Sequence, residues 1–252
     1  MNQLIKKLFF SLLGICICTM VSAQAILVKN SKSKSRIFLV EGTSTNKTAA
    51  EILQMYIQKM TNCNLPIIIG QQKMTKGDIV IGGETPAGVT EDGFSLSTKD
   101  GILRISGSGN GTVYGVVTLL EQYLGVDYWG ENEYSFNPAK TIELPLIDKI
   151  DNPAFRYRQS QCYALREDPV YKLWFRFEEP SEVFAGGMWV HTFDRILPSD
   201  VYGESHPEYY SFINGERRPG KASQWCLTNP EVFEMAAQKI DSIFKANPGK
   251  NM

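Results

Sequence analysis

The sequence predicts an α+β sandwich over residues 24–148, in which helices pack on one face of a mixed β-sheet, followed by a second region of different character. Up to residue 148, β-type runs and two amphipathic segments alternate in the order β-α-β-β-β-α-β. Beyond Pro153, aromatic residues become frequent, and loops rich in proline, glycine and glutamate separate short apolar runs. This change in composition predicts a domain junction at residues 148–153.

Residues 1–23 have the three parts of a secretory signal peptide. Lys6 and Lys7 give a positively charged start, residues 8–21 are almost all apolar, and a small-x-small pattern ends at Ala23. The apolar run is too short for a stable membrane span. We therefore expect export to the periplasm or the extracellular space, with no membrane contact after cleavage. A lipoprotein signal and an uncleaved membrane anchor are the alternatives.

The first helix is predicted from apolar residues that recur every three or four positions. These residues are Ala49, Ala50, Ile52, Leu53, Tyr56, Ile57 and Met60. Thr48 and Glu51 have the spacing of a capping box near the helix start, and Pro66 lies beyond its end. Two short strands, at 25–28 and 36–40, precede the helix.

Three further β-type segments lie between the two helices, at 66–69, 78–81 and 94–105. The last segment is predicted to be a hairpin, because Asp100-Gly101 between two β-type runs favours a tight turn. The second helix, 113–124, has one broad apolar face. Gly125 follows its last apolar residue, which is typical of a helix C-terminus.

Four glycines, at positions 107, 109, 111 and 115, lie between an apolar strand and this second helix. A dinucleotide-binding loop has the same layout but requires Gly-x-Gly-x-x-Gly, so that the backbone can approach a pyrophosphate. Counted from Gly107 or from Gly109, the third position is Thr112 or Tyr114. We therefore expect no cofactor, and a structural role for the glycines in a tight turn from strand to helix.

Composition argues against several functional classes. A chain of 252 residues, 43% hydrophobic and 21% charged, is typical of one or two globular domains. The formal net charge of -1 does not indicate a nucleic-acid partner. With two histidines and no Cys-x-x-Cys, we expect no metal site. Cys63, Cys162 and Cys226 allow either one disulfide or buried free thiols.

The segment that holds the glycines carries a resemblance to a known domain. Its residues are Gly111-Thr112-Val113-Tyr114-Gly115, Leu119-Leu120-Glu121, Leu124-Gly125-Val126 and Trp129. Together they resemble the end of the non-catalytic N-terminal domain of bacterial alpha-glucuronidases, which is similar to the accessory domain of beta-hexosaminidases. The resemblance implies that residues 24–148 form such an accessory domain.

Four motifs follow one another in the second region. They are His191-Thr192-Phe193, His206-Pro207-Glu208-Tyr209-Tyr210, Asn214-Gly215-Glu216-Arg217 and Cys226-Leu227-Thr228-Asn229-Pro230-Glu231-Val232. The series resembles a large bacterial family of secreted proteins of unassigned function, domain of unknown function 4838, in which the same accessory domain precedes a glycosidase-like barrel. The resemblance implies that residues 149–252 begin a (β/α)8-type barrel. A whole barrel takes at least about 200 residues, so we expect it to be incomplete in this chain, as in a fragment or truncated product.

Residues 151–158 look like the start of the first barrel strand of beta-hexosaminidases, where the arginine that matches Arg158 binds sugar. A planar guanidinium can donate two hydrogen bonds to adjacent hydroxyls, but a structural salt bridge is the alternative. Gln159 stands where that family has glycine. His191 follows an apolar run, so in a barrel it would lie at the active-site end of a strand. Sugar contact and packing are both open for His191.

Trp225 and Asn229 are predicted substrate-binding residues, because they stand where a strand end leads into a helix cap. Trp174 and Trp189 are further candidates for stacking on sugar faces, with burial in a core as the alternative. Glycoside hydrolysis usually needs two carboxylates. The acidic candidates, none with a distinguishing context, are Glu167, Asp168, Asp194, Glu204 and Glu216. We expect the catalytic pair to come from later strands, outside this chain.

The sequence thus predicts the N-terminal part of a secreted carbohydrate-active protein, a glycoside hydrolase similar to alpha-glucuronidases, with an oligosaccharide or polysaccharide as its partner. The alternative is a non-catalytic glycan-binding surface module or an inactive truncated product. The sugar, its linkage, the stereochemical outcome and the oligomeric state are left open.

Overall fold

The computed structural model describes residues 25–70, 73–130, 133–160, 162–163, 167–179 and 183–251. The expected signal peptide, residues 1–23, lies outside them. The chain divides after Glu178 into two compact units, called unit 1 and unit 2. Within the described part of the chain, no helix is long and apolar enough to cross a membrane.

Unit 1 is built on a six-stranded mixed sheet with the strand order β11-β6-β7-β5-β3-β4. The strands are β3 (Ile37–Leu39), β4 (Ile67–Ile69), β5 (Ile79–Ile81), β6 (Phe94–Lys99), β7 (Ile102–Gly107) and β11 (Asp148–Asp151). Strands β7, β5, β3 and β4 are parallel, whereas β6 and β11 run antiparallel to their neighbours. Every residue of β3 and β5 is buried, as expected for parallel strands covered on both faces.

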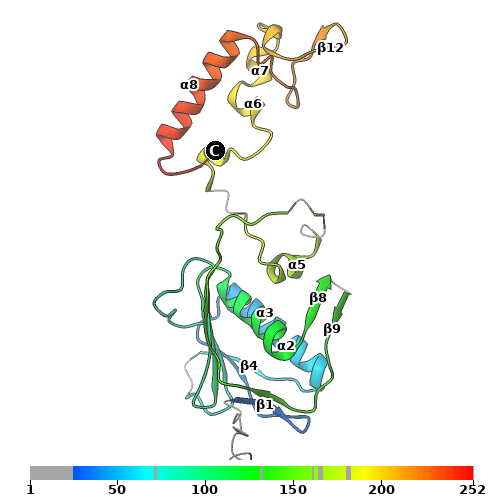
Figure 1. The fold of residues 1–252 in the computed structure, drawn as a ribbon, viewed down its shortest axis with the longest axis vertical. Helices are drawn as coiled ribbons and strands as arrows, with labels where there is room; N and C mark the ends of the chain where they lie inside the picture. The colour runs from blue at the N-terminus through cyan, green and yellow to red at the C-terminus, as the bar shows by residue number, and fades with distance from the viewer. Residues whose placement is uncertain are drawn as a thin grey trace, which may run out of the picture. The chain divides into compact units, whose positions relative to one another are not determined.

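Two helices, α2 (Ser44–Thr61) and α3 (Gly111–Leu124), lie side by side and pack on this sheet, as predicted (Figure 1). All seven apolar residues that predicted the first helix are buried in the core. Helix α2 nevertheless starts earlier than the expected capping box. Thr43 is its N-cap, and its hydroxyl accepts a hydrogen bond from the Asn46 amide at 3.2 Å. Gly125 ends α3 in the left-handed conformation, with φ of 66°.

A second, three-stranded antiparallel sheet completes the core of unit 1. It has the order β10-β1-β2, from β1 (Ala25–Lys29), β2 (Lys32–Ser33) and β10 (Ile142–Leu144). Leu27 and Leu144 are buried in the same hydrophobic cluster as the helices. Unit 1 is therefore a mixed α/β unit with more than one sheet.

The glycines between β7 and α3 allow three backbone segments to pack closely. A β-carbon on Gly111 would lie 1.8 Å from the carbonyl oxygen of Gly93, and one on Gly107 would lie 2.5 Å from the backbone of Gly111. The same Gly93 carbonyl accepts a hydrogen bond from the Ser108 amide at 3.1 Å. Only glycine fits such an approach, so these positions serve the turn from strand to helix.

Unit 1 extends beyond the junction that the sequence predicts at 148–153, because Asp148–Asp151 form strand β11 and pair with β6. The hairpin of β8 (Asp127–Gly130) and β9 (Glu133–Ser135) and the short helix α5 (Pro169–Trp174) also belong to it. Trp174 is 2% exposed and its ring stacks on Tyr128 with centroids 4.9 Å apart. Its indole nitrogen donates to Glu121 at 2.6 Å. Trp174 is therefore a core residue, which confirms the alternative of burial in a core over stacking on a sugar.

Unit 2 has a separate small core and mostly short elements. They are η2 (Ala185–Gly187), α6 (Phe193–Ile196), α7 (Ser199–Tyr202), η3 (Pro207–Tyr209), β12 (Phe212–Ile213), β13 (Glu216–Arg217) and α8 (Pro230–Ala246). The core residues are Met188, Ile196, Leu197, Tyr209, Tyr210, Trp225, Val232 and Ala236.

The opening of a barrel is not confirmed in unit 2. Barrel strands hydrogen-bond to neighbours on both sides. In the described residues 183–251, the strand pairing is the antiparallel β12–β13 hairpin, with isolated bridges elsewhere.

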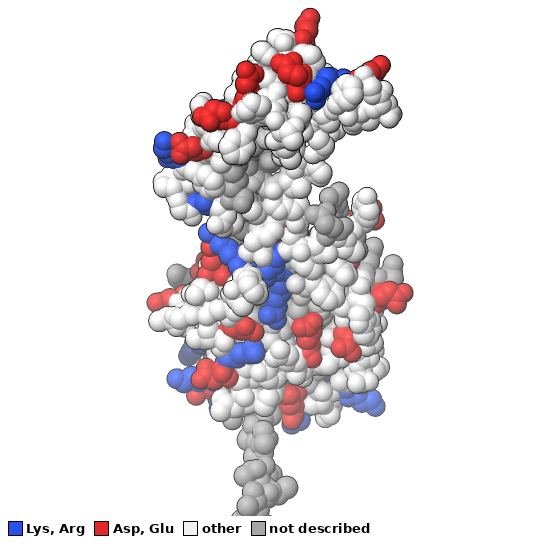
Figure 2. Space-filling view, turned by 45° about the horizontal axis from the view of Figure 1, so that its top comes forward, with Lys and Arg blue, Asp and Glu red and all other residues white. Residues whose placement is uncertain are grey.

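On the face visible in Figure 2, acidic and basic side chains are intermixed, in keeping with a formal net charge of -1.

Candidate functional site

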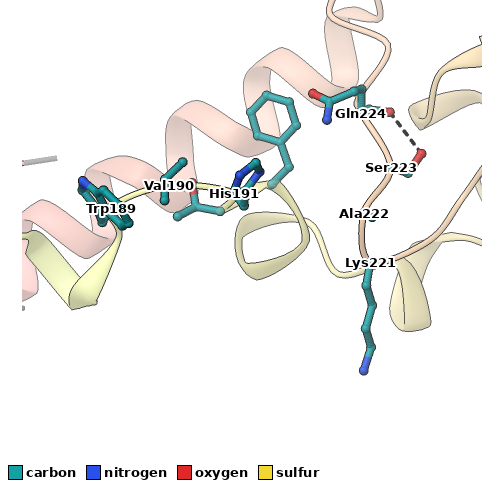
Figure 3. A pocket seen from close by; sticks show the side chains of 9 residues that line it. Trp189, Val190, His191, Lys221, Ala222, Ser223 and Gln224 are labelled. Atoms are coloured by element: carbon teal, nitrogen blue, oxygen red, sulfur yellow. Dashed lines mark hydrogen bonds between the residues drawn. The ribbon is translucent and has the colours of Figure 1, made fainter. Parts of the chain in front are cut away.

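A pocket of about 260 Å³ lies in unit 2 between two segments that are distant in sequence, and we call it the unit 2 pocket. Its described lining residues are Trp189, Val190, His191, Thr192, Phe193, Lys221, Ala222, Ser223 and Gln224. Figure 3 shows the two segments facing each other, with the Gln224 side chain reaching toward the His191 side. The Lys221 side chain extends away from the other labelled side chains, so its ammonium group stands at the margin.

The second segment, residues 221–224, is held at its end by backbone hydrogen bonds on both sides of Trp225. The Ser211 amide donates to the Gln224 carbonyl, and the Cys226 amide donates to the Tyr209 carbonyl, each at 2.8 Å. These bonds fix residues 224–226 against the buried Tyr209 and its neighbour.

The first segment, residues 189–193, follows a tight turn that the Arg195 guanidinium holds. Gly186 and Gly187 both have positive φ, and the Arg195 guanidinium donates to their carbonyl oxygens at 2.7 and 2.8 Å. His191 itself has φ of 55°. A left-handed backbone is uncommon outside glycine, although histidine tolerates it better than most residues, and such positions cluster at functional sites. His191 is exposed and lines the unit 2 pocket, and sugar contact by His191 stays a prediction.

Trp225 lies behind the wall of the pocket. Its indole is stacked on the Phe193 ring, with centroids 4.1 Å apart and an angle of 11° between the planes. Trp225 is 8% exposed, and among the described residues its Nε1 is the one buried side-chain nitrogen or oxygen without a hydrogen-bond partner. Burying a donor unpaired costs about 1–3 kcal/mol, and the described residues offer this N–H no acceptor.

Asn229 is the N-cap of α8 and has a structural role. Its side-chain oxygen accepts hydrogen bonds from the amides of Glu231 at 2.9 Å and Val232 at 3.4 Å. It does not line the unit 2 pocket. The cap explains why this residue type stands before Pro230, and sugar contact by Asn229 stays a prediction.

Arg158 lies in unit 1, where protein groups occupy its guanidinium. Its Nε donates to the Arg176 carbonyl at 2.7 Å, and its Nη1 donates to the Phe155 carbonyl at 2.5 Å. Its Nη2 pairs with Asp92 at 3.2 Å. The backbone of Arg158 also exchanges two hydrogen bonds with Glu178, each at 2.8 Å. These contacts favour the salt-bridge alternative for Arg158, and its sugar contact stays a prediction.

A second cavity, of about 330 Å³, lies beside Arg158 in unit 1. Tyr114 lines it and donates a short hydrogen bond to Glu178, which also accepts from the Asn110 side chain at 2.6 Å. Burial and the Glu178 carboxylate raise the pKa of Tyr114 far above its usual value. These bonds tie α3 to the segment that leads to Glu178, and they describe a structural network.

Two of the five acidic candidates for catalysis, Asp168 and Asp194, make local structural hydrogen bonds. Asp168 caps α5 by accepting from the amides of Val170 and Tyr171 at 2.9 and 3.0 Å. Asp194 accepts from Ser199, and these hydrogen bonds lower its pKa. None of the described lining residues of the unit 2 pocket is acidic. The described part of the chain also holds no group of three or more His, Cys, Asp or Glu side chains that could bind a metal ion.

Of the four predicted site residues, His191 lines the unit 2 pocket, whereas Trp225 lies behind it, stacked on Phe193. Arg158 and Asn229 do not line this pocket. Sequence reasoning missed the segment Lys221 to Gln224 and the part played by Phe193. Phe193 was visible in the motif that begins at His191. No local signal marks residues 221–224, because they line the pocket only when the fold brings them opposite residues 189–193.

Residues 128–252 match a family described as "Domain of unknown function (DUF4838)". The match agrees with the resemblance of the second region. No curated protein matches the sequence.

Among solved structures, the chain is similar to a GH20 exo beta-N-acetylglucosaminidase from Vibrio harveyi in complex with N-acetylglucosamine. That likeness has 20% identity, covers 54% of this chain and 19% of the enzyme, and has a TM-score of 0.33. A GH20 beta-N-acetylhexosaminidase from Streptomyces coelicolor A3(2) shows 18% identity, 53% and 25% coverage, and a TM-score of 0.35. A GH138 enzyme targeting pectin rhamnogalacturonan II shows 14% identity, 83% and 30% coverage, and a TM-score of 0.33.

All three similar structures are glycoside hydrolases. This chain spans between about a fifth and a third of the length of each. The TM-scores are too low to define a shared fold.

Proposed function

We propose that this chain is part of an exported carbohydrate-active protein and that the unit 2 pocket binds a sugar. One observation carries the proposal. Aromatic side chains and neutral or basic hydrogen-bonding groups line one small cavity, with Trp189 and His191 on one segment and Ser223 and Gln224 on the other. Sugars present an apolar ring face and a rim of hydroxyls. Ligand sites of this kind combine an apolar wall with a few placed polar groups.

The sign of the charges suggests which sugar the pocket takes. None of its nine described lining residues is acidic, and the ammonium group of Lys221 stands at the margin of the pocket. A carboxylate on the ligand would find donors here and no opposing carboxylate. We therefore propose a sugar acid as the ligand, in line with the resemblance to alpha-glucuronidases.

The proposed reaction is hydrolysis of a glycosidic bond by the whole protein to which this chain belongs. That reaction usually requires two carboxylates placed on either side of the bond. The described lining of the unit 2 pocket provides neither, so we propose that the pocket holds a part of the sugar away from the scissile bond. The same observation favours a second candidate, a non-catalytic glycan-binding module.

Calorimetric titration tests the proposal. The protein comprising residues 24–252 is titrated with D-glucuronic acid, and separately with D-glucose as the neutral counterpart. We expect saturable binding of the acid, tighter than that of glucose by at least about tenfold, or 1.4 kcal/mol. His191→Ala should weaken binding of the acid. His206→Ala is the matched control, because His206 pairs with Glu208 at 3.1 Å and does not line the pocket.

Equal loss in both histidine variants, or no binding of either sugar by the wild type, would contradict the sugar site. Release of nitrophenol from p-nitrophenyl alpha-D-glucuronide, measured with the whole protein to which this chain belongs, then separates the two candidates. A glycoside hydrolase turns this substrate over, whereas a binding module binds the acid and releases nothing.

A further inference from the structure

We propose that the Phe193 ring is a displaceable cover on Trp225, and that the indole beneath it is the platform on which the sugar stacks. This inference rests on the proposed function of the unit 2 pocket and names the residue that receives the ligand. It starts from a donor that the described protein leaves unpaired, Nε1 of Trp225.

The two rings have the geometry of a platform and its occupant. They lie nearly parallel, at 11°, with centroids 4.1 Å apart. A sugar ring stacks on an indole in the same parallel manner, because its C–H groups meet the negative face of the π-system. Phe193 lines the pocket and Trp225 does not. The phenyl ring therefore occupies the position that a ligand entering from the pocket would need.

The backbone is anchored differently under the two rings. Trp225 forms a β-bridge with Tyr210, which is 1% exposed, and both residues next to Trp225 hydrogen-bond to the same region. Phe193 is the first residue of α6, a helix of four residues whose N-cap, Thr192, makes no capping bond through its side chain. Such a short helix has little stability of its own. The indole is thus held in place by backbone hydrogen bonds on both sides. The helix that carries Phe193 is anchored by Arg195 and the buried Ile196, so the phenyl ring shifts by rotation of its own side chain.

The surroundings of Phe193 leave room for this shift. The ring is half-buried, and the pocket on its open side is rimmed by His191, Lys221 and Gln224, all exposed. When the phenyl ring turns away, one face of the indole opens to the pocket. A ligand that replaces it can stack there, and Nε1 can donate to a hydroxyl or carboxylate oxygen of the same ligand.

Binding measurements on two variants test the cover, again with D-glucuronic acid as the probe and residues 24–252 as the protein. For a cover that is open in about a tenth of the molecules, removing it tightens binding about tenfold. We expect this gain in Phe193→Ala and a smaller gain in Phe193→Leu, which keeps more of the apolar volume. Trp225→Phe keeps an aromatic ring but loses the donor, and we expect about tenfold weaker binding. Phe233→Ala, which removes a phenyl ring that is 70% exposed on α8, is the control and should change nothing.

Weaker binding in Phe193→Ala, similar to the loss in Trp225→Phe, would overturn the proposal, because Phe193 would then be a wall that touches the sugar. That result would leave the sugar site itself standing.

A ligand-free measurement separates the cover from the sugar site. Hydrogen exchange of the Trp225 indole N–H is followed by NMR, and the signal is assigned by its loss in Trp225→Phe. We expect Phe193→Ala to accelerate this exchange, while the N–H of Trp174, bonded to Glu121, keeps its rate. Unchanged exchange at Trp225 overturns the cover. Failure of the wild type to bind the acid overturns the sugar site, whatever the exchange shows.

Discussion

The turn between β7 and α3 gives a prediction in which two physical effects have opposite signs. Gly111 is the first residue of α3, and alanine is the better helix former by up to about 1 kcal/mol. An alanine β-carbon would, however, lie 1.8 Å from the Gly93 carbonyl oxygen, and 2.7 Å from the carbonyl carbon. These are backbone atoms that cannot turn aside. Helix propensity alone predicts that Gly111→Ala stabilises unit 1, and close packing predicts the reverse.

The size of the effect follows from what must move. Forcing a methyl group into a filled space costs about 1–3 kcal/mol. The Gly93 carbonyl also accepts the Ser108 amide at 3.1 Å, and pushing it away loses about 1 kcal/mol more. We therefore expect Gly111→Ala to lower the free energy of unfolding of unit 1 by about 2–4 kcal/mol.

Urea denaturation of the full chain, followed by far-ultraviolet circular dichroism, measures this change. Gly130→Ala is the matched control, since its β-carbon would meet nothing closer than 4.0 Å and should change stability by no more than about 0.5 kcal/mol. A Gly111→Ala protein as stable as the wild type, or more stable, would refute the account of the glycines as close-packing positions.

Two further predictions concern the core of unit 1. Trp174→Ala should cost about 3–5 kcal/mol in the same urea assay, because it removes a large buried ring that stacks on Tyr128; a loss under about 1 kcal/mol would contradict its place in the core. Burial opposes the ionisation of Asp78, but hydrogen bonds from Arg36 and Thr75 outweigh it and hold the pKa of Asp78 below its usual value. A lowered pKa contributes stability above the unfolded pKa of about 4 that is lost as the pH falls through the folded value. Asp78→Asn should therefore lose less stability than the wild type between pH 5 and pH 2, and an unchanged acid profile would count against this role.

Much of unit 1 could be predicted from local sequence, because its signals are local. The three- and four-residue spacing in α2 marks the buried face, and Gly125 marks the end of α3. The failure of the dinucleotide spacing also pointed to glycines that serve packing, and the approach of Gly111 to Gly93 is the physical reason for them.

The features that sequence reasoning missed depend on contacts between distant residues. Asp148–Asp151 carry three charged residues and look like a linker, and only pairing with β6 makes them strand β11. Trp174 lies in a stretch rich in aromatic residues, and nothing local distinguishes a ring that reaches Tyr128 from one that faces solvent. The same applies to the helix start, where Thr43 caps α2 although Thr48 and Glu51 have the spacing of a capping box.

Only part of the candidate site could be predicted, because it too depends on contacts between residues that are distant in sequence. His191 and Trp225 were identified from the strand ends and motifs around them, and in the structure His191 lines the pocket whereas Trp225 lies behind it, stacked on Phe193. Arg158 was singled out for a family resemblance, and its contacts with Asp92 and with backbone carbonyls are tertiary.

The central claim, that the unit 2 pocket is a sugar site, is tested most directly by mapping where a sugar acid binds. Amide and indole signals of the isotope-labelled chain are followed by NMR during titration with D-glucuronic acid. We predict saturable shifts confined to residues 189–193 and 221–225, including the Trp225 indole N–H. Shifts that map to unit 1 instead, or spectra that do not change at all, would contradict the claim.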